Sequence, residues 1–500
     1  MRSAIVIVGL VGALASRAAA YDQKVHVLLS AHAYGGPAVV TGDGAAVRAL
    51  RERLWHLGAE ARDAGLARRF RLRWPRIETF DAWSMKQLFA LNPEKRIAGF
   101  DDDVALPAGD TARDVYAAAS RLPDDDQRNR DRFRHDDRRG RVYDGWGRPV
   151  PDDPATLEMG GLTGLSSQAH AHYGLPHLAF SDEPSVLKSD PRRFAIPPTV
   201  HTFGADFADS YSLLAALASR MPGGQRLALT LAGAAAHHLE DVANQIHTVQ
   251  VGIYAFFVDA KIESIKEDLA SVGGLLRARP SFVSIGIDII SNHHVLAEAL
   301  YAKHLLSPSD PVTARTLAPI AASATRPAAC TPGFARAIAD KLIDQSSYEG
   351  PQVYAAIRTA AQRRWSRAGQ HFGDDDDPDA ALRPDADLTP FFDLEVTGAR
   401  RALVALGDWW TSFGACAALD DDAARTLGEA LVRERLDALD AAEARARIYA
   451  PKPPDANRRN WWIPIGYVLV LLVVVLLVRG RVRRRGARAE ASSDRAPPRR

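Results

Sequence analysis

Residues 231–248 read LAGAAAHHLEDVANQIHT, and this stretch guides the interpretation of the whole chain. His237 and Asp241 are four residues apart, so on a helix they share one face and can hold a cation together. His247 follows ten residues after His237, about 1000° around a helix, and therefore points away from that face. We expect it to meet a second cation or to lie beyond the helix end.

A second pair with the same spacing lies in SNHHVLAEALYAKHL, residues 291–305. His294 and Glu298 are four residues apart in a strongly helical run, and His293 is the neighbouring alternative to His294. Alanines flank Glu298 on both sides, which favours a packed environment over a solvated one. We therefore expect a second ligand pair here, with a surface His–Glu pair as the competing interpretation.

Further candidate ligands lie upstream of the first pair. The stretch YDQKVHVLLSAH, residues 21–32, contains Tyr21 and His26, and a Pro-rich connection is framed by Asp182 and His201. The same region holds alternatives that can replace His26 or His201 as ligands, namely His170, His172 and His177.

These motifs together resemble the zinc-dependent phospholipase C/P1 nuclease family. The resemblance rests on HHLEDVANQIHT, on NHHVLAE and on an aromatic residue followed by histidine at the expected mature N-terminus, and it spans Tyr21 to Glu298. It implies a mainly helical fold that binds three zinc ions. One implied ligand set is Asp182, His201, His237 and Asp241. A second is Tyr21, through its amine and carbonyl, with His26, and Asp241 bridges it to the first. The third is His247, His294 and Glu298.

The chain departs from the family pattern in three places. Tyr21 stands where the family usually has Trp, although the backbone atoms are the expected ligands. Gln245 stands where many members have Pro, so the end of the helix is expected to differ. The gap from His247 to His294 is much longer than is usual in the family.

The resemblance implies a zinc-dependent phosphodiester hydrolase, most directly a phospholipase C acting on glycerophospholipids. Hydroxide held between the zinc ions bridged by Asp241 would attack phosphorus, and Asp182 would also act as the catalytic proton acceptor. His238 and Glu240 are expected to support the ligands or face solvent. A P1-type nuclease or nucleotidase is the alternative, and it would need aromatic platforms for bases; Trp74, Trp83 and Trp146 are available. A non-catalytic, metal-stabilised tethered protein is the third hypothesis.

The two ends of the chain predict an exported, single-pass membrane protein. Residues 1–20 resemble a signal peptide, so cleavage would free the amine of Tyr21. Residues 461–478, WWIPIGYVLVLLVVVLLV, are uncharged and long enough to span a membrane. The basic tail at 479–500 predicts that the tail is cytoplasmic and the catalytic domain lies outside. Expected partners are therefore a phospholipid or other phosphodiester and the membrane, with nucleic acid only in the alternative.

Between these ends, strand signals are scarce and the amphipathic periodicity predicts a mainly α fold. Predicted helices include 44–69, 208–220, 226–247, 288–306, 334–346, 351–368 and 423–447. We expect a catalytic domain at 21–305, a helical C-terminal extension without readable chemistry at 306–448, and a spacer at 449–460. Cys330 and Cys416 can form a disulfide in an oxidising compartment or remain as buried thiols.

Two insertions are expected within the catalytic domain. Residues 101–158 are highly charged, which predicts a solvated insertion or long loop. Residues 249–287 contain apolar runs around a charged helical piece. They predict either a helical hairpin packed on the core or a lid that enters lipid through Tyr254, Phe256 and Phe257.

Overall fold

The structure is a computed structural model that describes residues 23–40, 46–75, 109–124, 204–247, 262–263, 265–266, 282–320, 329–367, 370, 372–373 and 376–448. The chain divides into two compact units, Met1–Ile448 and Tyr449–Arg500, and every described residue belongs to the first. The predicted signal peptide, spacer, membrane-spanning helix and basic tail lie outside the described residues. Within the described ranges, no helix is both long and apolar enough to cross a membrane.

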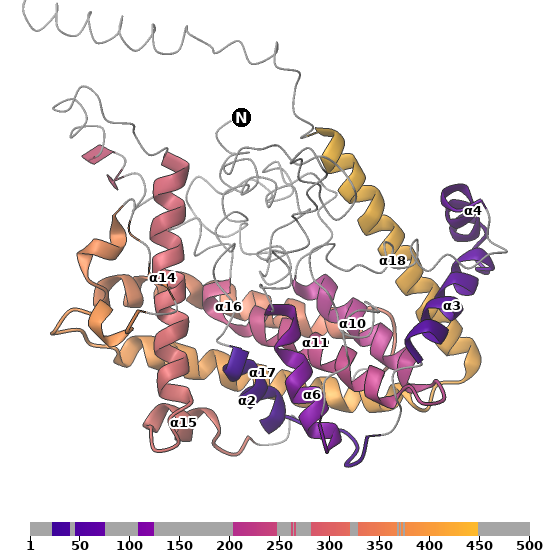
Figure 1. Cartoon of the computed structure of the whole chain (residues 1–500), viewed down its shortest axis with the longest axis horizontal. Coiled ribbons are helices and arrows are strands. Elements are labelled where there is room, and N and C mark those ends of the chain that lie inside the picture. The colour runs from indigo at the N-terminus through magenta and orange to yellow at the C-terminus, as the bar shows by residue number, and fades with distance from the viewer. Residues whose placement is uncertain are drawn as a thin grey trace, which may run out of the picture. The chain divides into compact units, whose positions relative to one another are not determined.

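The described residues fold into helices, which confirms the predicted mainly α class (Figure 1). The α-helices are α2 (Gln23–His32), α3 (Ala46–Ala59), α4 (Ala64–Arg73), α6 (Ala112–Ser120), α10 (Gly204–Ser219), α11 (Gln225–Ala243), α14 (Phe282–Leu305), α15 (Pro311–Thr316), α16 (Phe334–Ala360), α17 (Thr389–Cys416) and α18 (Asp421–Ile448). Short 3-10 helices are η2 (Leu122–Asp124), η4 (Gln245–His247), η6 (Arg363–Ser366) and η7 (Asp379–Ala381). These residues form no β-strand, only an isolated antiparallel bridge between Ala361 and Leu382.

Some helices begin or end at other residues than predicted, because local capping or core packing determines these ends. The range 44–69 breaks into α3 and α4, because the side chain of Asp63 accepts hydrogen bonds from the amides of Gly65 and Leu66 and starts a new helix. The range 334–346 and the first part of 351–368 join into α16, which continues through Pro351 and ends at Ala360. Residues on both sides of this proline are buried, and that packing offsets the one backbone hydrogen bond that proline removes.

The expectation that 101–158 forms a solvated insertion or loop is wrong for Ala112–Ser120, which form α6. A capping box between Thr111 and Asp114 starts this helix, and Val115, Tyr116 and Ala119 are buried on its inner face. The acidic residues around this short segment obscured its apolar face. The rest of the range, apart from 109–124, lies outside the described residues.

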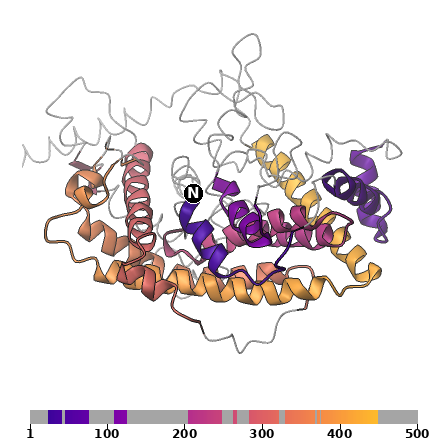
Figure 2. The ribbon, with the colours of Figure 1, turned by 60° about the horizontal axis from the view of Figure 1, so that its bottom comes forward.

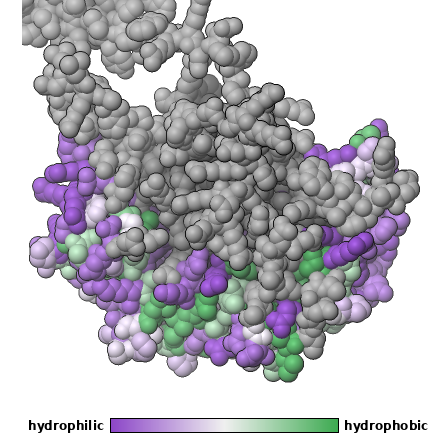
Figure 3. Space-filling model, in the orientation of Figure 1, coloured by the Kyte–Doolittle hydropathy of each residue, from purple (hydrophilic) through white to green (hydrophobic). Residues whose placement is uncertain are grey.

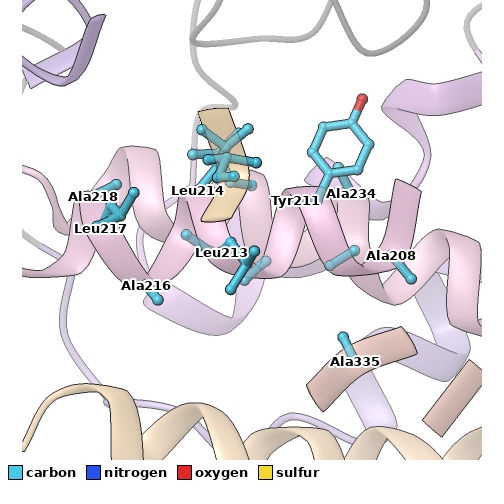
Figure 4. Packing of buried hydrophobic residues seen from close by; sticks show 14 of the residues in the cluster. Ala208, Tyr211, Leu213, Leu214, Ala216, Leu217, Ala218, Ala234 and Ala335 are labelled. Carbon is cyan, nitrogen blue, oxygen red and sulfur yellow. The ribbon is translucent and has the colours of Figure 1, made fainter. Parts of the chain in front are cut away.

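Helices α10 and α11 form the centre of the larger hydrophobic cluster, in which Tyr211, Leu213 and Leu214 pack on small side chains (Figure 4). Nearly all of α11 is buried, and its small residues allow close helix contacts. A Cβ atom at Gly233 would lie 2.4 Å from the carbonyl oxygen of Tyr116. Only glycine therefore lets α6 approach α11 this closely.

A second hydrophobic cluster is built from α2, α14, the C-terminal half of α16 and the N-terminal half of α17. Figures 1 and 2 show α14 crossing the long α17 steeply. The side chain of Asn292 binds the carbonyl oxygens of Trp365 and Gln370 and the amide of Phe372, which fixes the segment after α16 to α14. The two clusters meet where α11 ends and η4 begins, since α11 belongs to the first and Ile246 of η4 to the second.

Helix α14 begins at Phe282, inside the range 249–287 that was expected to form an insertion. Except for 262–263, 265–266 and the start of α14, that range lies outside the described residues, as do Tyr254, Phe256 and Phe257.

The two cysteines are joined in a disulfide. Cys330 precedes α16 and Cys416 ends α17, with their Cα atoms 5.1 Å apart. The sequence had left open whether the cysteines form a disulfide or remain as thiols, and the structure shows the disulfide.

Figure 3 shows hydrophilic residues over much of the coloured surface of this face, with hydrophobic patches between them.

Candidate metal centre

The end of α11 explains why His237 and His247 point in different directions. The helix stops at Ala243, and Asn244 adopts an extended conformation. The Asn244 side chain then accepts a hydrogen bond from the amide of Ile246, which turns the chain into η4. His247 therefore lies beyond the helix end, as the spacing allowed, and its side chain is buried.

His247, His294 and Glu298 form one compact cluster, here called the second triad. The Nε2 atoms of His247 and His294 are 3.2 Å apart, and each lies 2.9 Å from Glu298 Oε1. Ligands of a tetrahedral zinc ion, bound at about 2.0–2.1 Å, are separated by about 3.3 Å. The three atoms thus converge at nearly the spacing that one such cation requires, and all three residues are buried.

The electrostatics of the second triad favour a positive charge at its centre. Burial would lower the pKa of His247, but hydrogen bonds to Asp241 and Glu298 outweigh it and raise the pKa to about 10. Burial alone would raise the pKa of Glu298, but the neighbouring His294 and His247 lower it. A divalent cation would compete with protons here, because imidazole ligates only in its neutral form.

The other cluster consists of His26, His237 and Asp241. It is here called the first triad, because it contains the candidate ligands of α11, which come first in the argument. His237 Nε2 lies 3.0 Å from Asp241 Oδ2, and His26 Nε2 lies 3.5 Å from Asp241 Oδ1. The candidate ligand atoms of the three residues all lie within 4.8 Å of one another, and each residue is fully buried. Helix α2 thus brings His26 to the ligand pair that was predicted on α11.

Asp241 also connects the two triads. Its Oδ1 atom lies 3.5 Å from Nδ1 of His247, whose other ring nitrogen faces the second triad. A carboxylate near Nδ1 favours a proton there and leaves the Nε2 lone pair for a cation. One carboxylate therefore serves as a candidate ligand in the first triad and as an orienting group for the second.

Glu240 supports the first triad from the side of α2. Its Oε2 atom lies 2.5 Å from Nδ1 of His26, and its Oε1 atom accepts a hydrogen bond of 2.7 Å from the Ser30 hydroxyl. This contact leaves Nε2 of His26 facing Asp241. Burial raises the pKa of Glu240 to about 7, although the hydrogen bond and charge of His26 lower it. Of the two roles expected for Glu240, the structure supports contact with a ligand, since the side chain is fully buried.

The neighbouring histidines have other partners. His293, the alternative to His294, lies 3.3 Å from the Tyr354 hydroxyl through Nδ1 and 3.4 Å from the Ser366 hydroxyl through Nε2. His238 stacks on Phe207 and Tyr211 of α10. Neither histidine belongs to a triad.

The remaining predicted ligands, Tyr21, Asp182 and His201, lie outside the described residues, as do His170, His172 and His177. The described residues therefore provide two candidate cation positions. The second triad is the predicted set of His247, His294 and Glu298, whereas the first triad combines His26 from one predicted set with His237 and Asp241 from another.

Gln245 ties η4 to the C-terminal helices, a contact that the sequence did not reveal. Its Nε2 atom donates to Glu349 Oε2 at 2.8 Å and to the carbonyl oxygen of Leu394 at 2.7 Å. Glu349 also receives two hydrogen bonds from Arg401. A Cβ atom at Gly398 would lie 2.5 Å from Oε1 of Gln245. Gln245 thus anchors the segment that carries His247.

Comparison with family models, curated proteins and solved structures finds no match to this chain. The likeness to the phospholipase C/P1 nuclease family therefore rests on the spacing of the ligands in the sequence.

Proposed function

We propose that the chain is a zinc-dependent phosphodiester hydrolase of the phospholipase C kind. One observation carries the proposal: two buried triads, each of two histidines and one carboxylate, lie side by side and are linked through Asp241 and His247. Catalytic zinc sites commonly use three nitrogen and oxygen ligands, which leave a coordination position open. Structural sites more often use four ligands, frequently thiolates, and the two cysteines here are joined to each other instead.

Metal ions at such sites supply activated water at neutral pH and neutralise the charge on phosphoryl oxygens. The contributions of the chain itself are orientation and burial. Glu240 fixes the ring of His26 through a hydrogen bond, and the carboxylate of Asp241 lies 3.5 Å from Nδ1 of His247. Because both triads are buried, charges there interact more strongly than they would in water. The role of Asp182 as proton acceptor follows from the family resemblance.

A glycerophospholipid is the proposed substrate. The predicted membrane-spanning helix at 461–478 and the apolar runs in 249–287 support it, because both would bring the site near lipid. The disulfide fits the proposed location outside the cytoplasm, where oxidising conditions preserve such bonds. Of the aromatic residues considered for stacking bases, Trp74 packs on Trp55 and Phe70 within α3 and α4. That contact gives no support to a nuclease.

The test compares the full chain with Asp241→Asn for hydrolysis of phosphatidylcholine vesicles and of single-stranded nucleic acid. We expect release of phosphocholine by the wild type and a loss of about 100-fold in the variant, the upper end of the effect of a residue that supports a metal site. Cleavage of nucleic acid alone would move the function to the nuclease alternative. Tightly bound zinc without hydrolysis of either substrate would identify a non-catalytic metal protein.

A further inference from the structure

Glu395 of α17 is a buried carboxyl group that the sequence analysis did not connect with the site. It is only 2 % exposed, and its Oε2 atom has no hydrogen-bond partner among the described residues. Its own helix face is apolar, since Phe391 and Ala399, four residues to either side, are fully buried. A buried polar atom without a partner is destabilising, and more so when the group is charged. Such a group calls for a functional explanation.

The fold places Glu395 close to the second triad. Gln245, two residues before His247, binds the carbonyl oxygen of Leu394, and Glu395 is the next residue on α17. The neighbouring Val396 belongs to the same hydrophobic cluster as Leu296 of α14, the helix that carries His294 and Glu298. The segment that carries His247 therefore lies against this part of α17.

The charges agree with this placement. The pKa of Glu395 is raised to about 8, chiefly by burial and also by the negative charge of Glu298, while His247 opposes the rise. Glu395 thus interacts electrostatically with both a carboxylate and a histidine of the second triad. It is not part of the group whose ligand atoms all lie within 4.8 Å of one another. Glu395 therefore lies near enough to interact with the charges of the second triad but is not one of its candidate ligands.

The charge of a cation bound by the second triad gives a nearby carboxylate a role. A divalent cation held by one carboxylate and two neutral imidazoles leaves a net charge of about +1 in a buried core, which is unfavourable. A second carboxylate nearby would cancel that charge. We propose that Glu395 is an outer carboxylate of the second triad, which compensates the charge of the bound cation and raises its affinity. This inference rests on the metal-binding part of the proposed function and does not require hydrolysis.

The experiment measures zinc affinity in the full chain after removal of metal, by competition with a chromophoric chelator. The variants His294→Ala and His237→Ala identify which binding phase belongs to which triad. In Glu395→Gln, we expect the affinity of the second triad to fall about 10–100-fold, the usual effect of losing a group that supports a metal ligand. The phase of the first triad should not change. Glu395→Asp, which keeps the charge, should recover part of the affinity.

Glu434→Gln is the matched control, because Glu434 is a partly buried carboxyl outside the triads whose partners are Arg336 and Ser210. We expect no change in zinc affinity for this control. A thermal melt of the metal-free protein monitors folding, and Glu395→Gln should be at least as stable as wild type because it removes an ionisable group from the core.

Unchanged affinity at the second triad in Glu395→Gln would overturn the inference, as would an equal loss at both triads. If the wild type hydrolyses phosphodiesters and Glu395→Gln binds zinc normally, the inference fails and the proposed function remains. If the wild type binds zinc without hydrolysis and Glu395→Gln weakens the second triad, the inference stands and the proposed function fails.

Discussion

The disulfide between Cys330 and Cys416 predicts a large, measurable contribution to stability. It closes a loop of 86 residues, since that is the sequence separation of the two cysteines. In the chain-entropy model, a loop of this length removes about 15 cal/mol/K from the unfolded chain, or about 4.6 kcal/mol at 25 °C. Measured losses for native disulfides are typically about 2–5 kcal/mol. We therefore expect the free energy of unfolding to fall by about 2–4.6 kcal/mol in Cys330→Ser/Cys416→Ser.

Chemical denaturation of the full chain and of the double variant measures this difference. The midpoint should shift to lower denaturant in the variant, and a reducing agent should shift the wild type in the same direction. The reducing agent should leave the variant unchanged, which serves as the control. A difference below about 0.5 kcal/mol would refute the argument from loop length, and two titratable thiols in the unreduced wild type would refute the disulfide itself.

Three further predictions concern the support of the metal centre. Glu240→Gln removes the carboxylate at Nδ1 of His26, so zinc affinity at the first triad should fall about 10–100-fold in a chelator competition, with the second triad unaffected. Gly398→Ala places a Cβ atom 2.5 Å from Gln245 Oε1, so urea unfolding should show a loss of about 1–3 kcal/mol, and an unchanged midpoint would contradict the close contact. Removal of metal with a chelator should lower the melting temperature, because only the folded chain presents assembled triads, and added zinc should restore it.

The ligand pairs on single helices were the most predictable part of the site. The four-residue spacing of His237 and Asp241, and of His294 and Glu298, depends only on helix geometry, and both pairs lie within hydrogen-bonding distance. His26 is different, because it is more than 200 residues from Glu240, its closest partner at the site. Only the family resemblance connected it with α11, since spacing along the chain carries no information about such contacts.

Other features could not be read from the sequence for physical reasons. The disulfide depends on how α16 and α17 pack, which two isolated cysteines do not specify. Helix α6 was missed because its short apolar face lies between long charged segments. The range 306–448 was expected to carry no chemistry, yet it supplies Glu349 and Glu395 to the surroundings of His247. An acidic residue on an otherwise apolar helix face, as in FFDLEV, was the available signal.

The zinc content of the full chain, processed so that it begins at Tyr21, tests the central claim most directly. The two described triads predict at least two zinc ions per chain by elemental analysis, and the family resemblance predicts a third. His294→Ala should lose one zinc ion while it retains the helical circular dichroism spectrum of the wild type. A wild-type chain that folds, contains no zinc and takes up none from solution would show that the buried histidines are structural, and would contradict the account.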